Sequence, residues 1–165
     1  MNHPKGVIQI FSHISTDKVC DASNLYAATK LVDEYLVRWV DQVVRPVRAY
    51  CVRPANYWPS RGSVFEIWEK AKAEDKPILL TDERMERYFM PLGEAAKFVI
   101  KTLTLAKGGE IFIPKAENYK MIDIAKQYGD NIKIIGIRKG EKLKEDLFTV
   151  EEQKRLKDMG DYWVI

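Results

Sequence analysis

Two stretches decide the fold: VIQIFSHISTDK at residues 7–18 and NLYAATK at residues 24–30. The first predicts a β-strand from Val7 to Ile14 that ends in polar residues. The second opens a helix, predicted from about Leu25 to Val43, because apolar residues recur three and four positions apart. A strand followed at once by a helix indicates an α/β fold.

The helix carries an apolar stripe that we expect to face the core. Arg45-Pro46 should end the helix, since proline cannot continue it. The stripe consists of Ala28, Leu31, Val32, Tyr35, Leu36, Trp39 and Val40.

Shorter elements follow and indicate α/β overall, with a parallel fragment first and a smaller α+β lobe after it. The segment Pro54–Gly62 is the expected boundary, which divides the chain into 1–58 and 59–165. The predicted strands span 47–52, 78–81, 110–114 and 132–137, and the predicted helices 63–73, 91–106, 120–128 and 149–159.

The composition excludes several classes of protein. At 165 residues with 46% hydrophobic residues, the chain can build one ordinary core. The net charge is +3, and charges of both signs alternate, unlike the single-sign stripe of nucleic-acid-binding proteins. The sequence has neither an apolar run long enough to cross a bilayer nor a signal peptide, so we expect a cytoplasmic protein.

The two cysteines and two histidines suggest no special chemistry. Cys20 and Cys51 are far apart, without a CxxC pattern, and His3 and His13 add no metal-ligand spacing. We therefore expect no metal site and two ordinary thiols.

Two short motifs have the residue types for catalysis. Ser15-Thr16-Asp17-Lys18 stands at a strand end, where open parallel sheets collect their ligands. Tyr26 and Lys30 are four residues apart, so both project from one face of the helix, away from the apolar stripe. A free phenol titrates at about pH 10, and a neighbouring ammonium favours the phenolate, which can then act as a base.

Each motif also has an ordinary interpretation. A Tyr-x-x-x-Lys spacing arises easily by chance, as a surface tyrosine and a solvated lysine. Thr16 and Asp17 suit a turn or a helix cap. The order of the two motifs, at a strand end and then a helix start, favours chemistry.

With these motifs in place, the chain resembles the extended short-chain dehydrogenase/reductase family, specifically its UDP-N-acetylglucosamine 4,6-dehydratases. The resemblance runs from about Val7 to Ile165 and implies the C-terminal part of a Rossmann-like doubly wound sheet plus a small α+β substrate-binding lobe. The matching blocks are STDK at 15–18, NLYAATK at 24–30, SRGSV at 60–64, TDERMERY at 81–88, KGGEIFIP at 107–114 and IGIRKGEKL at 135–143.

The resemblance implies a reaction and a role for each motif residue. NAD or NADP would take a hydride from sugar C4 while Tyr26 removes the C4 hydroxyl proton, with Lys30 holding the cofactor ribose. Lys18 would take the C5 proton, and a protonated Asp17 would protonate the departing C6 hydroxyl; burial can disfavour its carboxylate. Thr16 would hydrogen-bond the C4 oxygen.

The resemblance also implies a set of contacts to the nucleotide sugar. Arginine suits the pyrophosphate because its planar fork binds phosphate oxygens in pairs. For Arg138 and Glu141 the alternative is an ordinary surface ion pair. The implied substrate-binding residues are Asn56, Ser60, Arg61, Met85, Arg87, Arg138 and Glu141.

The chain departs from the family in several respects, and two of them bear on the site. It contains no Gly-x-Gly-x-x-Gly turn for the cofactor pyrophosphate, so we expect it to be inactive alone. Residues 53–56 read Arg-Pro-Ala-Asn in place of Arg-Tyr-Gly-Asn, so this loop should run differently, since alanine does not adopt positive φ readily. The strand Val7–Ile14 would be an exposed sheet edge, so we expect a homo-oligomer or a complementary chain.

Three functions remain open. The chain could be one half of a dehydratase, which the Asp17-Lys18 pair favours. It could be a non-catalytic homologue that binds a nucleotide sugar or a partner, which the missing glycine-rich turn favours. A related sugar-nucleotide epimerase or reductase is the third, because Tyr26 and Lys30 are common to all of these enzymes.

Overall fold

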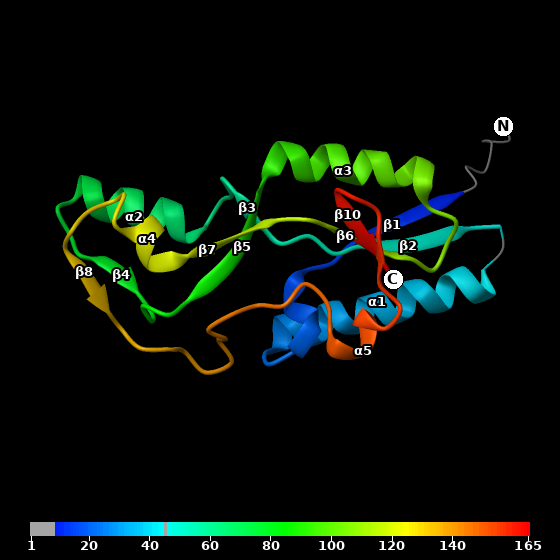
Figure 1. Ribbon diagram of the computed structural model, residues 1–165, viewed down its shortest axis with the longest axis horizontal. Helices are drawn as coiled ribbons and strands as arrows, with labels where there is room; N and C mark the ends of the chain where they lie inside the picture. The colour runs from blue at the N-terminus through cyan, green and yellow to red at the C-terminus, as the bar shows by residue number, and fades with distance from the viewer. Residues whose placement is uncertain (1–8, 45) are drawn as a thin grey trace, which may run out of the picture.

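The computed structural model describes residues 9–44 and 46–165, and a five-stranded sheet organises one of its two lobes (Figure 1). The strand order is β1-β2-β6-β10-β9. The first three are parallel, and β10 and β9 are added antiparallel. Their bounds are Ile10–Ile14 for β1, Arg48–Val52 for β2, Ile111–Pro114 for β6, Lys157–Asp158 for β9 and Tyr162–Val164 for β10.

A helix covers each face of this sheet (Figure 1). Alternate residues of a strand point to opposite faces. Cys51 and Ile113 therefore pack with Val37 of α1 (Leu25–Val43), whereas Tyr50 and Phe112 pack with Phe98 of α3 (Leu92–Leu105). The result is a three-layer α/β sandwich, as the sequence predicts.

The second lobe is smaller and mixed. The three-stranded sheet β3-β5-β7 leads into it, and the parallel pair β4–β8 lies at its far end (Figure 1). Its core gathers around Phe65 and Trp68, and the indole of Trp68 donates to Leu79 O at 2.9 Å. The bounds are Asn56–Trp58 for β3, Val64–Ala73 for α2, Ile78–Leu80 for β4, Glu86–Pro91 for β5, Glu117–Lys120 for β7, Met121–Ala125 for α4 and Ile132–Ile134 for β8.

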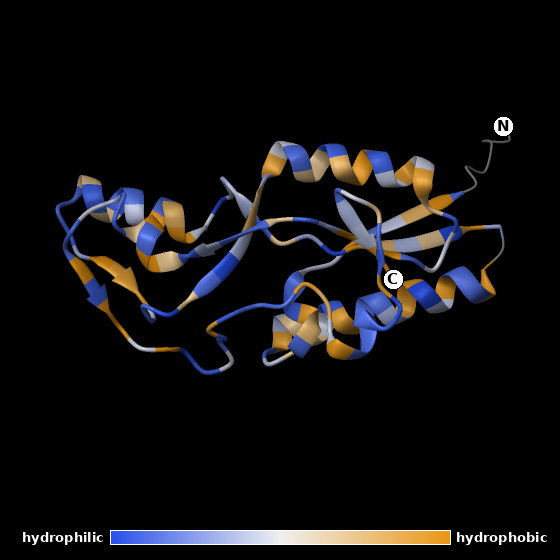
Figure 2. Cartoon of the chain, in the orientation of Figure 1, coloured by the Kyte–Doolittle hydropathy of each residue, from blue (hydrophilic) through white to orange (hydrophobic). Residues whose placement is uncertain are grey.

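The predicted helix at 25–43 is correct in its bounds but wrong in the face that it buries. Val32, Tyr35, Leu36 and Trp39 of the apolar stripe are exposed, and Tyr35 is 65% exposed. The opposite face, with Ala27, Glu34 and Val37, lies on the sheet. Glu34 lies on the inner face because it pairs with a buried arginine just after β2, described below. Figure 2 shows apolar and polar residues alternating along both long helices.

The C-terminal prediction is wrong for a related reason. The predicted helix at 149–159 is only α5 (Val150–Gln153), and β9 and β10 follow it. β10 pairs with β6, which is about fifty residues earlier in the chain, and among the described strands β9 in turn pairs only with β10, so local periodicity carries no signal for either strand. The loop at 53–56 adopts no positive φ, since Asp75 is the non-glycine residue with positive φ among those described.

The two lobes interleave along the chain. Strands β6, β9 and β10 come after residue 58 and yet complete the sheet that β1 and β2 begin. The division into 1–58 and 59–165 stays a prediction about domains. Across residues 9–44 and 46–165, no helix combines the length and apolarity needed to cross a membrane.

Candidate active site

The first motif lies at the carboxyl ends of two neighbouring parallel strands. Ser15 N donates to Val52 O at 2.7 Å, which continues the β1–β2 ladder, and Asp17 N donates to Pro54 O at 3.1 Å. The chain then turns into a 3-10 helix, Asp17–Asp21, whose N-cap Thr16 accepts from Lys18 N. Asp17 and Lys18 therefore face the start of β3, where Asn56 lies.

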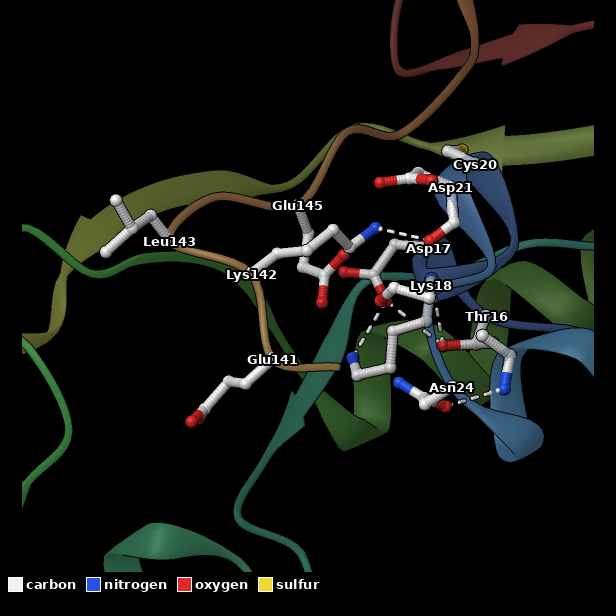
Figure 3. A network of polar contacts seen from close by, with 12 residues as sticks. Thr16, Asp17, Lys18, Cys20, Asp21, Asn24, Glu141, Lys142, Leu143 and Glu145 are labelled. Carbon is white, nitrogen blue, oxygen red and sulfur yellow. Dashed lines mark hydrogen bonds and ion pairs between the residues drawn. The ribbon is translucent and has the colours of Figure 1, made fainter. Parts of the chain in front are cut away.

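Four side chains form a continuous polar cluster, three of which Figure 3 labels. Lys18 Nζ donates to Asp17 Oδ1 at 3.0 Å and to Asn56 Oδ1 at 2.9 Å. The Thr16 hydroxyl donates to Asp17 Oδ1 at 3.0 Å, and Asn56 Nδ2 approaches Asp17 Oδ2 at 3.5 Å. The Asp17 side chain is 0% exposed and that of Lys18 is 26% exposed, so within the pair it is the amine that reaches open space.

The second motif lies at the start of α1. The Asn24 side chain caps this helix by accepting from Ala27 N at 2.9 Å. Tyr26, on the first turn, is 54% exposed. Lys30, one turn later, lies beneath it and donates from Nζ to Ile14 O at 2.9 Å, at the end of β1. The two motifs therefore meet at the same edge of the sheet.

One cavity of about 580 Å³ joins this edge to the second lobe. Asp17 and Lys30 lie outside its lining, and Asp17 is hydrogen-bonded to Thr16 and Lys18, which belong to the lining. The predicted site residues that line it are Thr16, Lys18, Tyr26, Asn56, Ser60, Arg61, Met85, Arg87, Arg138 and Glu141.

Arg87 has a structural task in this cavity. Its guanidinium donates to Glu86 O at 2.7 Å, Leu143 O at 3.0 Å and Lys142 O at 2.7 Å. These bonds hold residues 138–145, which we call the strap, against β5. Arg138 and Glu141 are on the strap, and the Glu141 carboxylate accepts from Arg138 N at 3.1 Å and not from its guanidinium.

The strap also reaches back to the first lobe. Ser23 Oγ donates to Gly140 O at 2.9 Å. Lys142 Nζ donates to Asp21 O at 3.1 Å (Figure 3). Gly140 has φ +78°, and an added Cβ would lie 2.8 Å from Ser23 O. Glycine is thus required there twice, for its conformation and for the close approach. Figure 3 shows the Glu141 side chain pointing away from Asp17 and Lys18.

Sequence reasoning missed four polar residues of the cavity, Ser15, Tyr57, Ser63 and Thr81. Ser15 and Ser63 line it, and their buried Oγ atoms have no hydrogen-bond partner among the described residues. Such atoms suit ligand hydroxyls, because a buried polar group is normally paired. Tyr57 also lines it, and burial raises the pKa of Tyr57 to about 12, with Tyr26 and Asp17 contributing, so its hydroxyl stays a neutral donor. The only sequence signal for Tyr57 as a cavity residue is that it directly follows Asn56.

A buried ion-pair network supports the site from behind. Arg53, 1% exposed, follows β2 and donates to both carboxylate oxygens of Glu34, at 3.0 and 2.7 Å. It also donates to both oxygens of Glu152, at 2.9 and 2.7 Å. Burial acts to lower the pKa of Arg53, but its hydrogen bonds to Glu152 and Glu34 outweigh burial and raise it. Through this network, Arg53 connects α1 and α5 to the loop that begins at Pro54.

The residues present fit one end of a nicotinamide cofactor. Tyr26 offers an exposed phenol beside the cluster, and Lys30 stands one turn below it with its ammonium held at the end of β1. The sequence has no glycine-rich turn for the pyrophosphate.

Comparison with known families shows to which family the chain belongs. Residues 4–165 match the family model described as polysaccharide biosynthesis protein. The chain belongs to this family. A UDP-N-acetylglucosamine 4,6-dehydratase (inverting) of Campylobacter jejuni is 37% identical over 157 residues, 92% of this chain and 47% of that protein. A capsular polysaccharide biosynthesis protein of Staphylococcus aureus is 33% identical over 158 residues, 90% of this chain and 26% of that protein.

Solved structures of other proteins agree with the fold. Pen from Bacillus thuringiensis superposes with a TM-score of 0.88 at 30% identity, over 95% of this chain and 52% of that one. A dTDP-glucose 4,6-dehydratase from Streptomyces venezuelae gives a TM-score of 0.74 at 16% identity, over 88% and 53%. The predicted fold class, the C-terminal part of a Rossmann-like protein, is confirmed. The chain spans about half the length of the Campylobacter dehydratase and of Pen, and about a quarter of the Staphylococcus protein.

Proposed function

We propose that this chain provides the substrate site and the acid–base residues of a nucleotide-sugar 4,6-dehydratase that acts on a UDP-N-acetylhexosamine in surface-polysaccharide biosynthesis. The observation that carries the proposal is the single cavity shared by Thr16, Lys18 and Tyr26 with Arg61 and Arg138. A sugar ring near the cluster would leave its diphosphate near the arginines.

The Asp17–Lys18 pair can supply both the acid and the base that water elimination requires. In the ion pair, the lysine holds the shared proton; moving it to the carboxylate gives a neutral amine and a carboxylic acid with the same total charge. The amine can then take the C5 proton while the acid protonates the departing C6 oxygen, so that the C5–H and C6–O bonds break and a C5–C6 double bond forms. The step ends with the ion pair that the structure contains.

Asp17 does not line the cavity, so its proton must pass through a neighbour that does. Thr16 and Lys18 are both hydrogen-bonded to Asp17 Oδ1 and both line the cavity, but Lys18 is the base in this step, so Thr16 is the neighbour that can pass the proton on. Thr16 donates to Asp17 here, so its hydroxyl must rotate before it can donate to the C4 oxygen. Tyr26 holds the C4 hydroxyl proton in this scheme.

We propose NAD or NADP as the cofactor, which when bound accepts a hydride from C4 and returns it to C6. Tyr26 and Lys30 would hold its nicotinamide ribose, and residues outside this chain its pyrophosphate. The proposal is supported by the half-length match to the dehydratase relatives. A cytoplasmic location stays a prediction.

We also propose a homo-oligomer or a complementary chain. Val32, Leu36 and Trp39 leave an apolar surface on α1, and within the described residues β1 is paired on one side only. Exposed patches and open sheet edges of this kind favour association. Light scattering should show self-association that Trp39→Glu weakens, whereas a clean monomer at working concentration would contradict it.

Calorimetric titration of the chain with UDP-N-acetylglucosamine and, separately, with NAD tests the substrate assignment. We expect the nucleotide sugar to bind and NAD to bind weakly or not at all. Absence of nucleotide-sugar binding would contradict the proposal.

A second assay tests the chemistry without cofactor. In a UDP-linked 4-keto-6-deoxy-N-acetylhexosamine, the C5 hydrogen is acidic because it is adjacent to the keto group. Lys18 should exchange it for deuterium in D₂O, which collapses the C6 methyl doublet in the proton NMR spectrum. Binding without exchange would favour the alternative function, a non-catalytic nucleotide-sugar-binding module. The observation that favours this alternative function is the absence of a glycine-rich turn from the sequence.

A further inference from the structure

We infer that Asn56 is a positioning residue for the base Lys18, and not the substrate contact that the family resemblance implies. This inference rests on the proposed function. The side chain of Asn56 lies against the acid–base pair and not only along the cavity wall. Its Oδ1 accepts from Lys18 Nζ at 2.9 Å, and its Nδ2 approaches Asp17 Oδ2 at 3.5 Å.

The orientation of the Asn56 amide is fixed by the backbone of β5. Nδ2 donates to Tyr88 O at 2.9 Å, and a carbonyl oxygen can only accept. Oδ1 must therefore face the other way, toward Lys18. Strands β3 and β5 pair in parallel, with Asn56 opposite Phe89, so the sheet itself holds the amide in this place.

This arrangement gives the lysine two different acceptors. Asp17 is charged and can take a proton, whereas the Asn56 amide is neutral and cannot. When the proton moves from Lys18 to Asp17, Asn56 Oδ1 still accepts an N–H of the neutral amine. The amine lone pair then faces Asp17, and a rotation about the Cε–Nζ bond turns it into the cavity, where Lys18 is 26% exposed. Asn56 thus holds the Lys18 side chain in the same position whether its amine is protonated or neutral.

The test measures C5 deuterium exchange in the UDP-linked 4-keto-6-deoxy sugar, with the full 165-residue chain. Asn56→Ala should slow exchange about 10- to 100-fold, the loss typical of a misplaced catalytic group. Its affinity for UDP-N-acetylglucosamine should stay within about twofold of wild type, because no substrate contact is removed. Asn118→Ala, on the neighbouring strand β7 and outside the cavity, is the matched control and should exchange at the wild-type rate.

A double-mutant cycle tests whether Asn56 acts through Lys18. In a Lys18→Met background, Asn56→Ala should cause no further loss, since the group that it positions is gone. An equal fractional loss in both backgrounds would overturn the inference. So would a fall in affinity as large as the fall in exchange rate, which would make Asn56 a substrate contact.

A readout without substrate separates this inference from the proposed function. The Lys18 ammonium, held by two acceptors, should give a ¹⁵N–¹H correlation signal that Asn56→Ala abolishes and Asn118→Ala retains. Asn56→Asp, which preserves the shape and an acceptor for Lys18, should keep the signal and still slow exchange, because a second carboxylate stabilises the protonated amine. If wild type exchanges no deuterium, the proposed chemistry fails; if the Lys18 signal survives Asn56→Ala, the inference on Asn56 fails.

Discussion

The inner and outer ends of the cavity are built differently. At the inner end, Asp17 is fully buried and Lys18 and Asn56 are bonded to it and to each other. At the outer end, Arg61 and Arg138 are exposed, and within the part of the chain that the structure describes neither guanidinium has an ion-pair partner. The inner end is preorganised before any ligand arrives, as catalysis requires. The outer end is left free to pair with a charged ligand.

Loss of the base should have the largest effect. Lys18→Met removes the amine that takes the C5 proton, and general-base catalysis contributes about 10²- to 10⁴-fold. We therefore expect C5 deuterium exchange to fall by at least about 100-fold while the nucleotide sugar still binds in calorimetry. Lys97→Met, at an exposed position on α3, should leave exchange unchanged. Equal rates in the two variants would contradict a catalytic inner end.

The inner end also depends on the buried network behind it. Arg53→Met leaves the Glu34 and Glu152 carboxylates without their partner, and breaking a buried ion pair from one side costs about 3–5 kcal/mol. We expect the free energy of unfolding, measured by urea denaturation, to fall by about this amount. Arg84→Met, which removes an exposed pair with Asp82, should cause no measurable change. A loss of similar size in both variants would mean that the network does not support the site.

The sequence predicts where the inner end lies, but it does not predict the buried network of Arg53, Glu34 and Glu152 that lies behind it. The strand end at Thr16, the helix start at Tyr26 and their common edge follow from periodicity and from the geometry of parallel sheets. The buried face of α1 does not, because Glu34 looks like a surface residue until Arg53, 19 positions later, is placed opposite it. Strands β3, β5 and β10 were missed for the same reason: their partners are distant in sequence.

Charge at the outer end should affect binding and not chemistry. Arg138→Ala removes a guanidinium expected at the pyrophosphate, and a hydrogen bond to a charged group contributes about 1.5–3 kcal/mol. The dissociation constant for UDP-N-acetylglucosamine should rise about tenfold or more, and deuterium exchange at saturating sugar should stay at the wild-type rate. Lys139→Ala, the exposed neighbour, should bind nearly as wild type does. If Arg138→Ala lost deuterium exchange even at saturating sugar, the outer end would affect the chemistry as well as binding, which would contradict the proposed difference between the two ends.

Displacing the strap should have the smallest effect. Gly140→Ala places a Cβ 2.8 Å from Ser23 O and should push the strap away from the segment that leads into α1. Gly136→Ala introduces a side chain at a similar positive φ, +87°, in open space, so the strain is matched and the clash is not. We expect Gly140→Ala to bind the nucleotide sugar a few-fold more weakly than Gly136→Ala. Equal affinities would show that strap contact with this segment does not position Arg138.

The central claim is that Lys18 and Tyr26 act on one sugar ring while the diphosphate lies toward Arg138. A crystal structure of the chain with UDP-N-acetylglucosamine measures this directly. The account predicts the hexose in the cavity, with C5 within about 3–3.5 Å of Lys18 Nζ and the C4 oxygen toward Tyr26. A sugar bound outside the cavity, or one that faces the strap while its uridine occupies the inner end, would contradict it.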